Sequence, residues 1–242
     1  MDLPDFCALC GAAQDDFGDH VLCCKATGVY GRHNAIRDTL ADLLRECGCE
    51  CRTEVTLPGS SLRPADIFTP AFPGESALAI DVSAVHPLPL SQTASATVTA
   101  GAAAQKREIA KVDLYGEKCS RRAWGFTAFV GETTGAWGPA AQRTVRALVR
   151  AKSLRTGDDP EEIAHTFWGA LGRAMASAVA RQLVKARSLS GALRSQQRPV
   201  PASTSAAAQS SDAQAPSGAA GGPPGEEGPA ASDLRLATEL CL

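Results

Sequence analysis

The sequence predicts an α/β protein that is preceded by a small cysteine-rich segment and followed by a low-complexity tail. Apolar residues recur at helical spacing in several segments, and short β-branched and apolar stretches lie between them. Four of the nine cysteines fall within the first 31 residues. The 44% hydrophobic and 21% charged fractions are typical of a soluble protein, and no run of about eighteen apolar residues offers a membrane span. We therefore expect no membrane partner.

Shifts in composition divide the 242 residues into four segments. Residues 1–31 are cysteine-rich, 32–153 contain the predicted core, 154–194 are predicted basic helices, and 195–242 are mainly Ala, Ser, Pro, Gly and Gln. The tail is too poor in large apolar residues to order itself, so we expect it to be disordered. The net charge is −2, but 141–195 contain ten Lys and Arg against four Asp and Glu, which leaves +6 there. Such a segment can bind a phosphate backbone, although a solvated helical face would also explain any one of these charges.

The cysteine-rich segment contains a pattern that is typical of a zinc site. Cys7, Cys10, His20 and Cys24 form Cys-x2-Cys-x9-His-x3-Cys, a mixed set of thiolates and imidazole that suits tetrahedral Zn²⁺. The segment is too short to have a core, so bound zinc would supply its folding energy, and we expect a metal-bound loop. The alternative is a group of ordinary thiols with a surface histidine. Cys23 competes with its neighbour Cys24, and the sequence leaves that choice open.

The cellular compartment determines whether the cysteines can form disulfides. The N-terminus lacks the basic and apolar regions of a secretory signal, so we expect a reducing environment in which the thiols do not form disulfides. Three alternate cysteines near the end of the first predicted helix are interpreted as packing residues, with a second metal site left open: Cys47, Cys49 and Cys51.

The first helix and the strands follow from periodicity and turn residues. Apolar residues recur at helical spacing over 34–47 and stop before Gly48, which predicts an amphipathic helix. Three strands are predicted over 51–57, 62–68 and 77–85, because these stretches are rich in β-branched and apolar residues and are separated by Pro-Gly pairs.

The second half of the core is predicted to contain three helices and one strand. We expect a helix over 102–119, a strand over 124–131, a helix over 140–153, and a last amphipathic helix, or a broken pair, over 160–189. The apolar stripe of the last segment consists of Ile163, Phe167, Leu171, Met175 and Val179. Up to residue 153 the predicted order is therefore α, three β, α, β, α.

Two aspartates lie inside otherwise apolar strand stretches. Burying the lone carboxylate of Asp66 or Asp81 would be costly, so each needs a partner. If their strands pair as a hairpin, the two aspartates lie close enough to share a hard ion such as Mg²⁺, and Glu54 on the preceding strand can supply a third oxygen. An ion held in this way would polarise a phosphoryl oxygen and activate water, which is the chemistry of phosphodiester hydrolysis. The alternative is that Asp81 caps or forms an ion pair with Arg63.

Several short motifs follow one another in a fixed order over about 7–190. They are the Cys-x2-Cys pair, Gly18-Asp19-His20, Arg32-His33-Asn34, Arg63-Pro64-Ala65-Asp66, Asp81-Val82-Ser83, Glu132-Thr133-Thr134-Gly135 and Trp137-Gly138. The series resembles the C-terminal segment of non-LTR retrotransposon proteins that carry a restriction-like endonuclease. The resemblance implies a PD-(D/E)XK nuclease-like mixed sheet flanked by helices, with a CCHC-type zinc knuckle, and a module that nicks target DNA to prime reverse transcription. Its partners would be target-site DNA and the RNA of the element, and its location would be nuclear.

The resemblance assigns roles to individual residues. Asp66 and Asp81 would bind catalytic Mg²⁺ or Mn²⁺ in addition to the structural Zn²⁺, and Arg32, His33 and Arg63 would lie near the DNA or the active centre. Nothing in the chain resembles the reverse transcriptase. We therefore interpret the chain as a fragment, a truncated copy or a domesticated module, with a catalytically inactive zinc-dependent nucleic-acid-binding module as the alternative function.

One departure from the family pattern concerns the catalytic lysine. Ser83 stands where a PD-(D/E)XK enzyme has that lysine, so the cation must come from elsewhere or be missing. Lys106 and Lys111 in the helix 102–119 are the candidates. In a helical projection Lys106 borders the stripe of Ile109 and Val112 that should face the sheet, whereas Lys111 points away. Lys111 followed by Tyr115, however, is more similar to the family pattern, so both lysines remain candidates.

Overall fold

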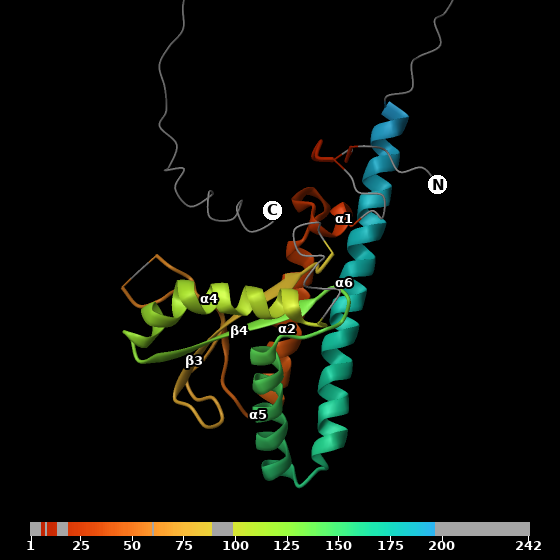
Figure 1. Ribbon diagram of the computed structural model, residues 1–242. Coiled ribbons are helices and arrows are strands. Elements are labelled where there is room, and N and C mark those ends of the chain that lie inside the picture. Colours follow the sequence, from red (N-terminus) through yellow and green to blue (C-terminus); the bar gives the residue numbers. More distant parts are fainter. Residues whose placement is uncertain (1–5, 8, 14–18, 60, 89–98, 197–242) are drawn as a thin grey trace, which may run out of the picture. The chain divides into compact units, whose positions relative to one another are not determined.

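The protein has a four-stranded mixed sheet flanked by helices, as the α/β prediction requires (Figure 1). The computed structural model describes residues 6, 7, 9–13, 19–59, 61–88 and 99–196. Residues 1–191 form one compact unit, and of the second unit, 192–242, only the last residues of helix α6 are described. From residue 197 on, the tail that was predicted to be disordered lies outside the described residues.

The sheet has the order β1-β2-β3-β4. β1 (Arg52–Val55), β2 (Ala65–Thr69) and β3 (Ala77–Val85) form an antiparallel meander, and β4 (Trp124–Glu132) pairs parallel to β3 along its whole length. The parallel pair is connected by helix α4 (Ala102–Ser120), since parallel neighbours need a crossover. All four predicted strands are present, with β1 and β2 shorter than predicted.

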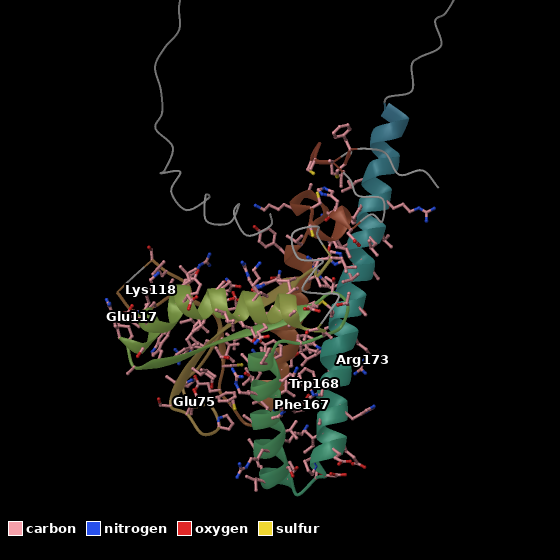
Figure 2. The ribbon with its side chains drawn as sticks, viewed as in Figure 1. Glu75, Glu117, Lys118, Phe167, Trp168 and Arg173 are labelled. Atoms are coloured by element: carbon pink, nitrogen blue, oxygen red, sulfur yellow. The ribbon has the colours of Figure 1, made fainter. Side chains whose placement is uncertain are left out.

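The helices cover the two faces of the sheet (Figure 1). On one face, Ala104 of α4 packs against Ala128 and Val130 of β4. On the other face lie α2 (Tyr30–Glu46), α5 (Pro139–Thr156) and α6 (Pro160–Gln196). The main core fills the space between these helices and the sheet, and its largest fully buried side chains are Ile36, Leu40, Leu44, Ile67, Ile80, Phe129, Leu148, Phe167 and Leu171. Figure 2 marks Phe167 and Trp168 on α6.

Some predicted boundaries were wrong. α2 begins at Tyr30 rather than at residue 34, so Arg32 and His33 lie inside the helix and not in a connection before it. The segment predicted as a loop contains a short helix α1 (His20–Cys23) and a 3₁₀ turn η1 (Lys25–Thr27). The segment 160–189 lies within the single helix α6, which rules out the broken pair.

Three cysteines were interpreted as packing residues, and their burial agrees with this. Cys47 and Cys49 belong to the main core, and Cys51 packs against it. Burial raises the pKa of the Cys47 thiol to about 11, as expected of an inert neutral thiol.

Two buried glutamates connect the helices to the sheet. The Glu132 carboxylate, at the end of β4, accepts hydrogen bonds from the N–H groups of Ala103 and Ala104 at distances of 3.0 and 3.2 Å, at the start of α4. Glu108 of α4 in turn accepts hydrogen bonds from Ala140 and Ala141 at 2.9 and 3.1 Å, at the start of α5. Both carboxylates satisfy amide groups that a helix N-terminus leaves unpaired. They hold α4 in a defined position across β3 and β4.

Within the part of the chain that the structure describes, no helix combines the length and the apolar composition that a membrane span needs.

Candidate functional site

The predicted zinc ligands come together in the structure. Cys7 and Cys10 lie on a turn that is closed by a 2.8 Å hydrogen bond from the Gly11 amide to the Cys7 carbonyl, and His20 and Cys24 come from α1 and the residue after it. The Sγ atoms of Cys7 and Cys24 are 4.0 Å apart, and Cys10 Sγ lies 3.2 Å from His20 Nε2. All four donor atoms lie within 4.8 Å of one another. This Cys₃His set can bind Zn²⁺.

The position of α1 decides between the two adjacent cysteines. Cys24 is buried and points into the cluster, whereas Cys23 does not belong to it. Burial, together with the neighbouring Cys10 and Cys7, raises the pKa of Cys24 to about 11. The pKa of Cys7 is lowered, because hydrogen bonds from the amides of Leu9 and Cys10 outweigh its burial. A bound Zn²⁺ would favour the thiolate form of all three cysteines.

The cluster is attached to the rest of the unit through polar contacts. Gln182 of α6 is 3% exposed and donates from Nε2 to the Val21 carbonyl at 2.9 Å and to the Thr27 hydroxyl at 2.7 Å. His86, just beyond β3, lies 3.1 Å from Asp19 Oδ1 through Nε2 and 2.6 Å from the Thr133 hydroxyl through Nδ1. The segment that carries the Cys₃His cluster is therefore held against the end of the sheet and the middle of α6.

The two predicted acidic ligands lie where the pairing of β2 with β3 ends. The antiparallel register runs from Thr69 opposite Leu78 to Ile67 opposite Ile80, so Asp66 and Asp81 are the next residues along the two strands. Beyond this point a side chain replaces the backbone ladder, since Asp66 Oδ2 accepts a 2.6 Å hydrogen bond from the Val82 amide. The carboxylate of Asp66 is thereby oriented by the edge of β3.

His33 lies on the other side of Asp66. Its Nδ1 lies 2.9 Å from the Val82 carbonyl, and because a carbonyl oxygen only accepts, Nδ1 carries the proton. Its Nε2 faces Asp66 Oδ1 at 3.4 Å. In the neutral ring the lone pair of Nε2 would face the Asp66 carboxylate oxygen, and the two acceptors would repel each other. A proton on Nε2, or a cation between the two atoms, removes this repulsion. Accordingly, the hydrogen bond with Asp66 raises the pKa of His33 against the opposing effect of burial.

Glu54 of β1 completes this group of donors. The donor atoms of His33, Glu54 and Asp66 all lie within 4.8 Å of one another, a mixed nitrogen and oxygen set that can hold a divalent ion. The prediction placed Glu54 with both aspartates, whereas the structure groups it with Asp66 and His33. Arg37, one turn after His33 on α2, donates to Glu54 Oε1 at 2.5 Å. Arg37 was missed, although its spacing of four residues from His33 was a usable signal.

Asp81 is held by a lysine. Lys111 Nζ of α4 lies 2.9 Å from Asp81 Oδ2, and the two side chains are 17% and 7% exposed. The Ser83 hydroxyl donates to Asp81 Oδ1 at 3.3 Å. Burial raises the pKa of Asp81, and the charge of Lys111 offsets only part of this effect. The alternative partner proposed for Asp81 was wrong, because Arg63 faces Glu54 at 3.7 Å instead.

The helical projection of α4 was wrong. Ile109 and Val112, which were expected to face the sheet, are 56% and 46% exposed, and Lys106 is exposed with them. The face that meets the sheet instead carries Ala104, Glu108, Lys111, Tyr115 and Cys119. Polar side chains are accommodated on this face because the Glu108 carboxylate binds the start of α5 and Lys111 binds Asp81.

Two further side chains of α4 lie near the carboxylates. Lys111 Nζ is 5.4 Å from the centre of the Tyr115 ring, and the pKa of Tyr115 is raised by burial and by the charges of Asp81 and Asp66. Arg107 lies one turn before Lys111, and its charge lowers the pKa of both Asp81 and Tyr115. Arg107 was not predicted, although its spacing from Lys111 places it on the same face of the helix.

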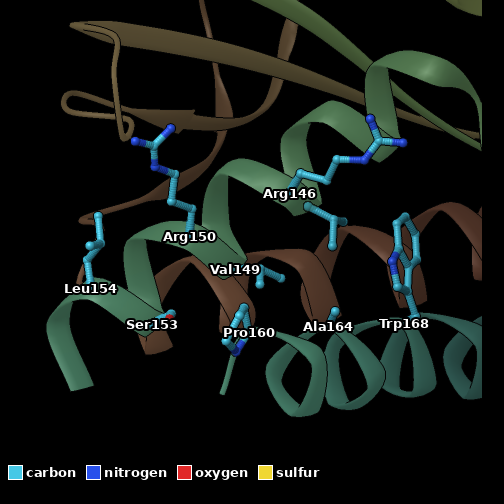
Figure 3. A pocket seen from close by; sticks show the side chains of 9 residues that line it. Arg146, Val149, Arg150, Ser153, Leu154, Pro160, Ala164 and Trp168 are labelled. Atoms are coloured by element: carbon cyan, nitrogen blue, oxygen red, sulfur yellow. The ribbon is translucent and has the colours of Figure 1, made fainter. Parts of the chain in front are cut away.

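The predicted DNA-binding arginines differ in exposure. Arg32 is 4% exposed, so little of its side chain is available at the surface, whereas the Arg63 side chain is 62% exposed. In the basic segment, Arg143, Arg146 and Arg150 form an exposed row along α5. Beside this row a groove of about 310 Å³ opens between α5 and α6, with an apolar floor that includes Trp168 (Figure 3). None of the carboxylate-site residues lines this groove.

No protein-family model matches this chain, and no curated protein matches it. The candidate site is therefore defined by its geometry and chemistry alone.

Proposed function

We propose that this protein is a divalent-metal-dependent DNA endonuclease module of the PD-(D/E)XK class, built like the restriction-like endonuclease of non-LTR retrotransposon proteins. The observation that carries the proposal is the pair of aspartates at the end of the hairpin, with Lys111 2.9 Å from Asp81. Two carboxylates and a lysine on three consecutive elements, β2, β3 and α4, match the chemistry of this class although Ser83 replaces the lysine of the motif. The order α, three β, α, β supports the same class.

The residues of the site have separate tasks in the proposed reaction. His33, Glu54 and Asp66 would hold a divalent ion, which would polarise a phosphoryl oxygen and lower the pKa of a bound water. Asp66 is oriented by the Val82 amide, and His33 by the Val82 carbonyl, so both donors are fixed by one residue of β3. A fixed second hydrogen bond of this kind is what a ligand histidine requires.

Lys111 and Asp81 would act on the phosphate itself. The ammonium group of Lys111 lies in a site where water is partly excluded, and there a fixed positive charge stabilises negative charge that develops on a phosphoryl oxygen. Asp81 holds this ammonium group in position. Its raised pKa indicates that the carboxylate gains from additional positive charge, which a substrate-bound cation would provide.

Nucleic acid is the proposed partner because the cationic surfaces suit a phosphate backbone. The row of Arg143, Arg146 and Arg150 on α5 and the exposed Arg63 beside Glu54 provide positive charge on two parts of the surface. The Cys₃His cluster would serve as a second, zinc-stabilised contact. A DNA target places the proposed activity in the nucleus.

Nicking of supercoiled plasmid tests the proposal. The purified protein is incubated with Mg²⁺ or Mn²⁺, and we expect open-circular product, with Mn²⁺ effective at the lower concentration because an imidazole donor suits transition ions. Asp66→Asn removes a proposed metal donor and Asp81→Asn releases the Lys111 ammonium group, and each should lower the rate about a hundredfold. Asp42→Asn is the matched control, because this carboxylate is 71% exposed and forms a surface ion pair with Arg45, away from the candidate site. Absence of nicking, or equal nicking rates in all variants, would refute the proposed endonuclease activity.

A catalytically inactive nucleic-acid-binding module is the second candidate. Ser83 in place of the motif lysine favours it, as does Glu54, whose charge is already matched by Arg37 and Arg63. For this candidate we expect DNA binding that survives both aspartate substitutions, with no nicking under any metal. The plasmid assay combined with a gel-shift assay therefore separates the two functions.

A further inference from the structure

Arg107 of α4 lies one turn from Lys111, and no acidic side chain among the described residues pairs with it. The sheet-facing side of α4 presents Arg107 and Lys111 one turn apart. Lys111 is engaged by Asp81 at 2.9 Å, whereas Arg107 forms no ion pair within 4.0 Å with any acidic side chain that the structure describes. Its Nε atom is completely buried and has no hydrogen-bond acceptor among the described residues. An unpaired buried donor on a guanidinium group is costly, so a missing acceptor is indicated.

The surroundings define what that acceptor is. Arg107 precedes Lys111 by four residues on α4, which places it on the same side of the helix as Lys111, whose Nζ lies 2.9 Å from Asp81 Oδ2. In agreement with this, its charge opposes the effect of burial, which raises the pKa of Asp81 and of Tyr115. Among the described carboxylates, Asp81 is already bound by Lys111 and Ser83. Glu108, the next residue, is engaged by the Ala140 and Ala141 amides. Among the described residues no acidic side chain supplies the acceptor, and a guanidinium group forms its strongest hydrogen bonds with anionic oxygens such as those of a phosphate.

We propose that Arg107 and Lys111 form a phosphoryl-binding subsite in which Arg107 donates to a non-bridging oxygen of the phosphodiester that is cleaved. This inference rests on the proposed nuclease function and names the substrate contact of the same site. The planar guanidinium group presents parallel N–H donors that match two oxygens of a phosphate, whereas an ammonium group acts as a point charge. The two cations thus have different roles. The guanidinium group of Arg107 orients the phosphate through parallel N–H donors, and Lys111 provides a positive charge beside Asp81.

A kinetic test separates this role from a general effect of charge. Arg107→Gln should lower kcat for plasmid nicking about a hundredfold to a thousandfold, as loss of one preorganised donor to a developing oxyanion does, with little change in KM. Arg107→Lys keeps the charge but loses the fork, and we expect it to recover only part of the rate. Arg121→Gln is the matched control at the C-terminal end of the same helix, because the Arg121 side chain is 73% exposed and pairs with Glu117. Figure 2 marks Glu117 on α4. Full activity of Arg107→Lys, or equal rates for Arg107→Gln and Arg121→Gln, would overturn the proposal.

A binding test is independent of cleavage. The Nε–H resonance of Arg107, assigned by its loss in Arg107→Lys, is followed by NMR while inorganic phosphate is added to the zinc-loaded protein. We expect a saturable shift at Arg107 that is absent for Arg121, and thermal unfolding of each variant confirms that it is folded. No shift at Arg107 would refute the subsite even if nicking is observed. A shift without nicking would support the anion subsite and refute the nuclease.

Discussion

The ion pair between Lys111 and Asp81 makes a prediction about stability that can be worked out from its burial. The change is Lys111→Ala, which leaves the Asp81 carboxylate, 7% exposed, without its cation. Removal of one partner of a buried pair typically costs about 3–5 kcal/mol, and the partial exposure of Lys111, 17%, reduces the expected cost to about 2–3 kcal/mol. This magnitude applies at a pH where Asp81 is ionised.

The predicted loss of stability depends on pH, and its direction follows from the pKa of Asp81. Burial raises the pKa of Asp81 in the folded protein, so the folded state holds this proton more tightly than the unfolded chain does. Stability is therefore lost as pH rises from the unfolded pKa, about 4, to the higher folded pKa, and the loss is complete above it. Lys111→Ala raises the folded pKa further and enlarges that loss. We expect the variant to be destabilised more at pH 8 than at pH 5.

Urea unfolding of the zinc-loaded protein at the two pH values measures the effect. The double variant Lys111→Ala with Asp81→Asn should recover most of the stability lost at pH 8, because no charge is then left buried. The matched control is Lys118→Ala on the same helix, whose side chain is exposed and lies over the ring of Tyr115. The reasoning would be refuted if the loss were equal at both pH values, or if the double variant were no more stable than Lys111→Ala.

Three further predictions follow from other parts of the structure. Cys7→Ser should reduce the zinc content to well below one ion per chain by elemental analysis and lower the melting temperature, whereas Cys23→Ser, outside the cluster, should retain the ion. Glu108→Ala leaves two buried amides without an acceptor and should destabilise the protein by about 2–4 kcal/mol in urea unfolding; an effect below about 1 kcal/mol would contradict this account. Replacing Arg146 and Arg150 by Ala should weaken binding to duplex DNA and reduce the slope of log K against log salt by about 1.8, and an unchanged slope would exclude this row from the interface.

The sequence predicted the fold better than the site, and α4 shows why. Its length and position followed from the apolar and alanine residues of 102–119, and the structure confirms a helix over Ala102–Ser120. Its orientation did not follow, because the projection assumed that the most apolar stripe faces the sheet. Ile109 and Val112 are exposed, since Glu108 and Lys111 have polar partners on the sheet side. An apolar moment predicts the buried face only where the neighbouring surface is itself apolar.

The grouping of the metal donors depended on a detail that no sequence pattern contains. Asp66 and Asp81 were paired from the hairpin alone, and the register does place them as neighbours at the end of the ladder. Because β2 stops pairing there, the Val82 amide and carbonyl are left for Asp66 and His33, and these two side chains turn toward each other. Asp81, on the same strand as Val82, turns instead to Lys111. The candidate site is thus divided into the group of His33, Glu54 and Asp66, which can hold a metal ion, and the ion pair of Asp81 with Lys111. The division follows from where the five-residue strand β2 ends, which is a property of the folded sheet.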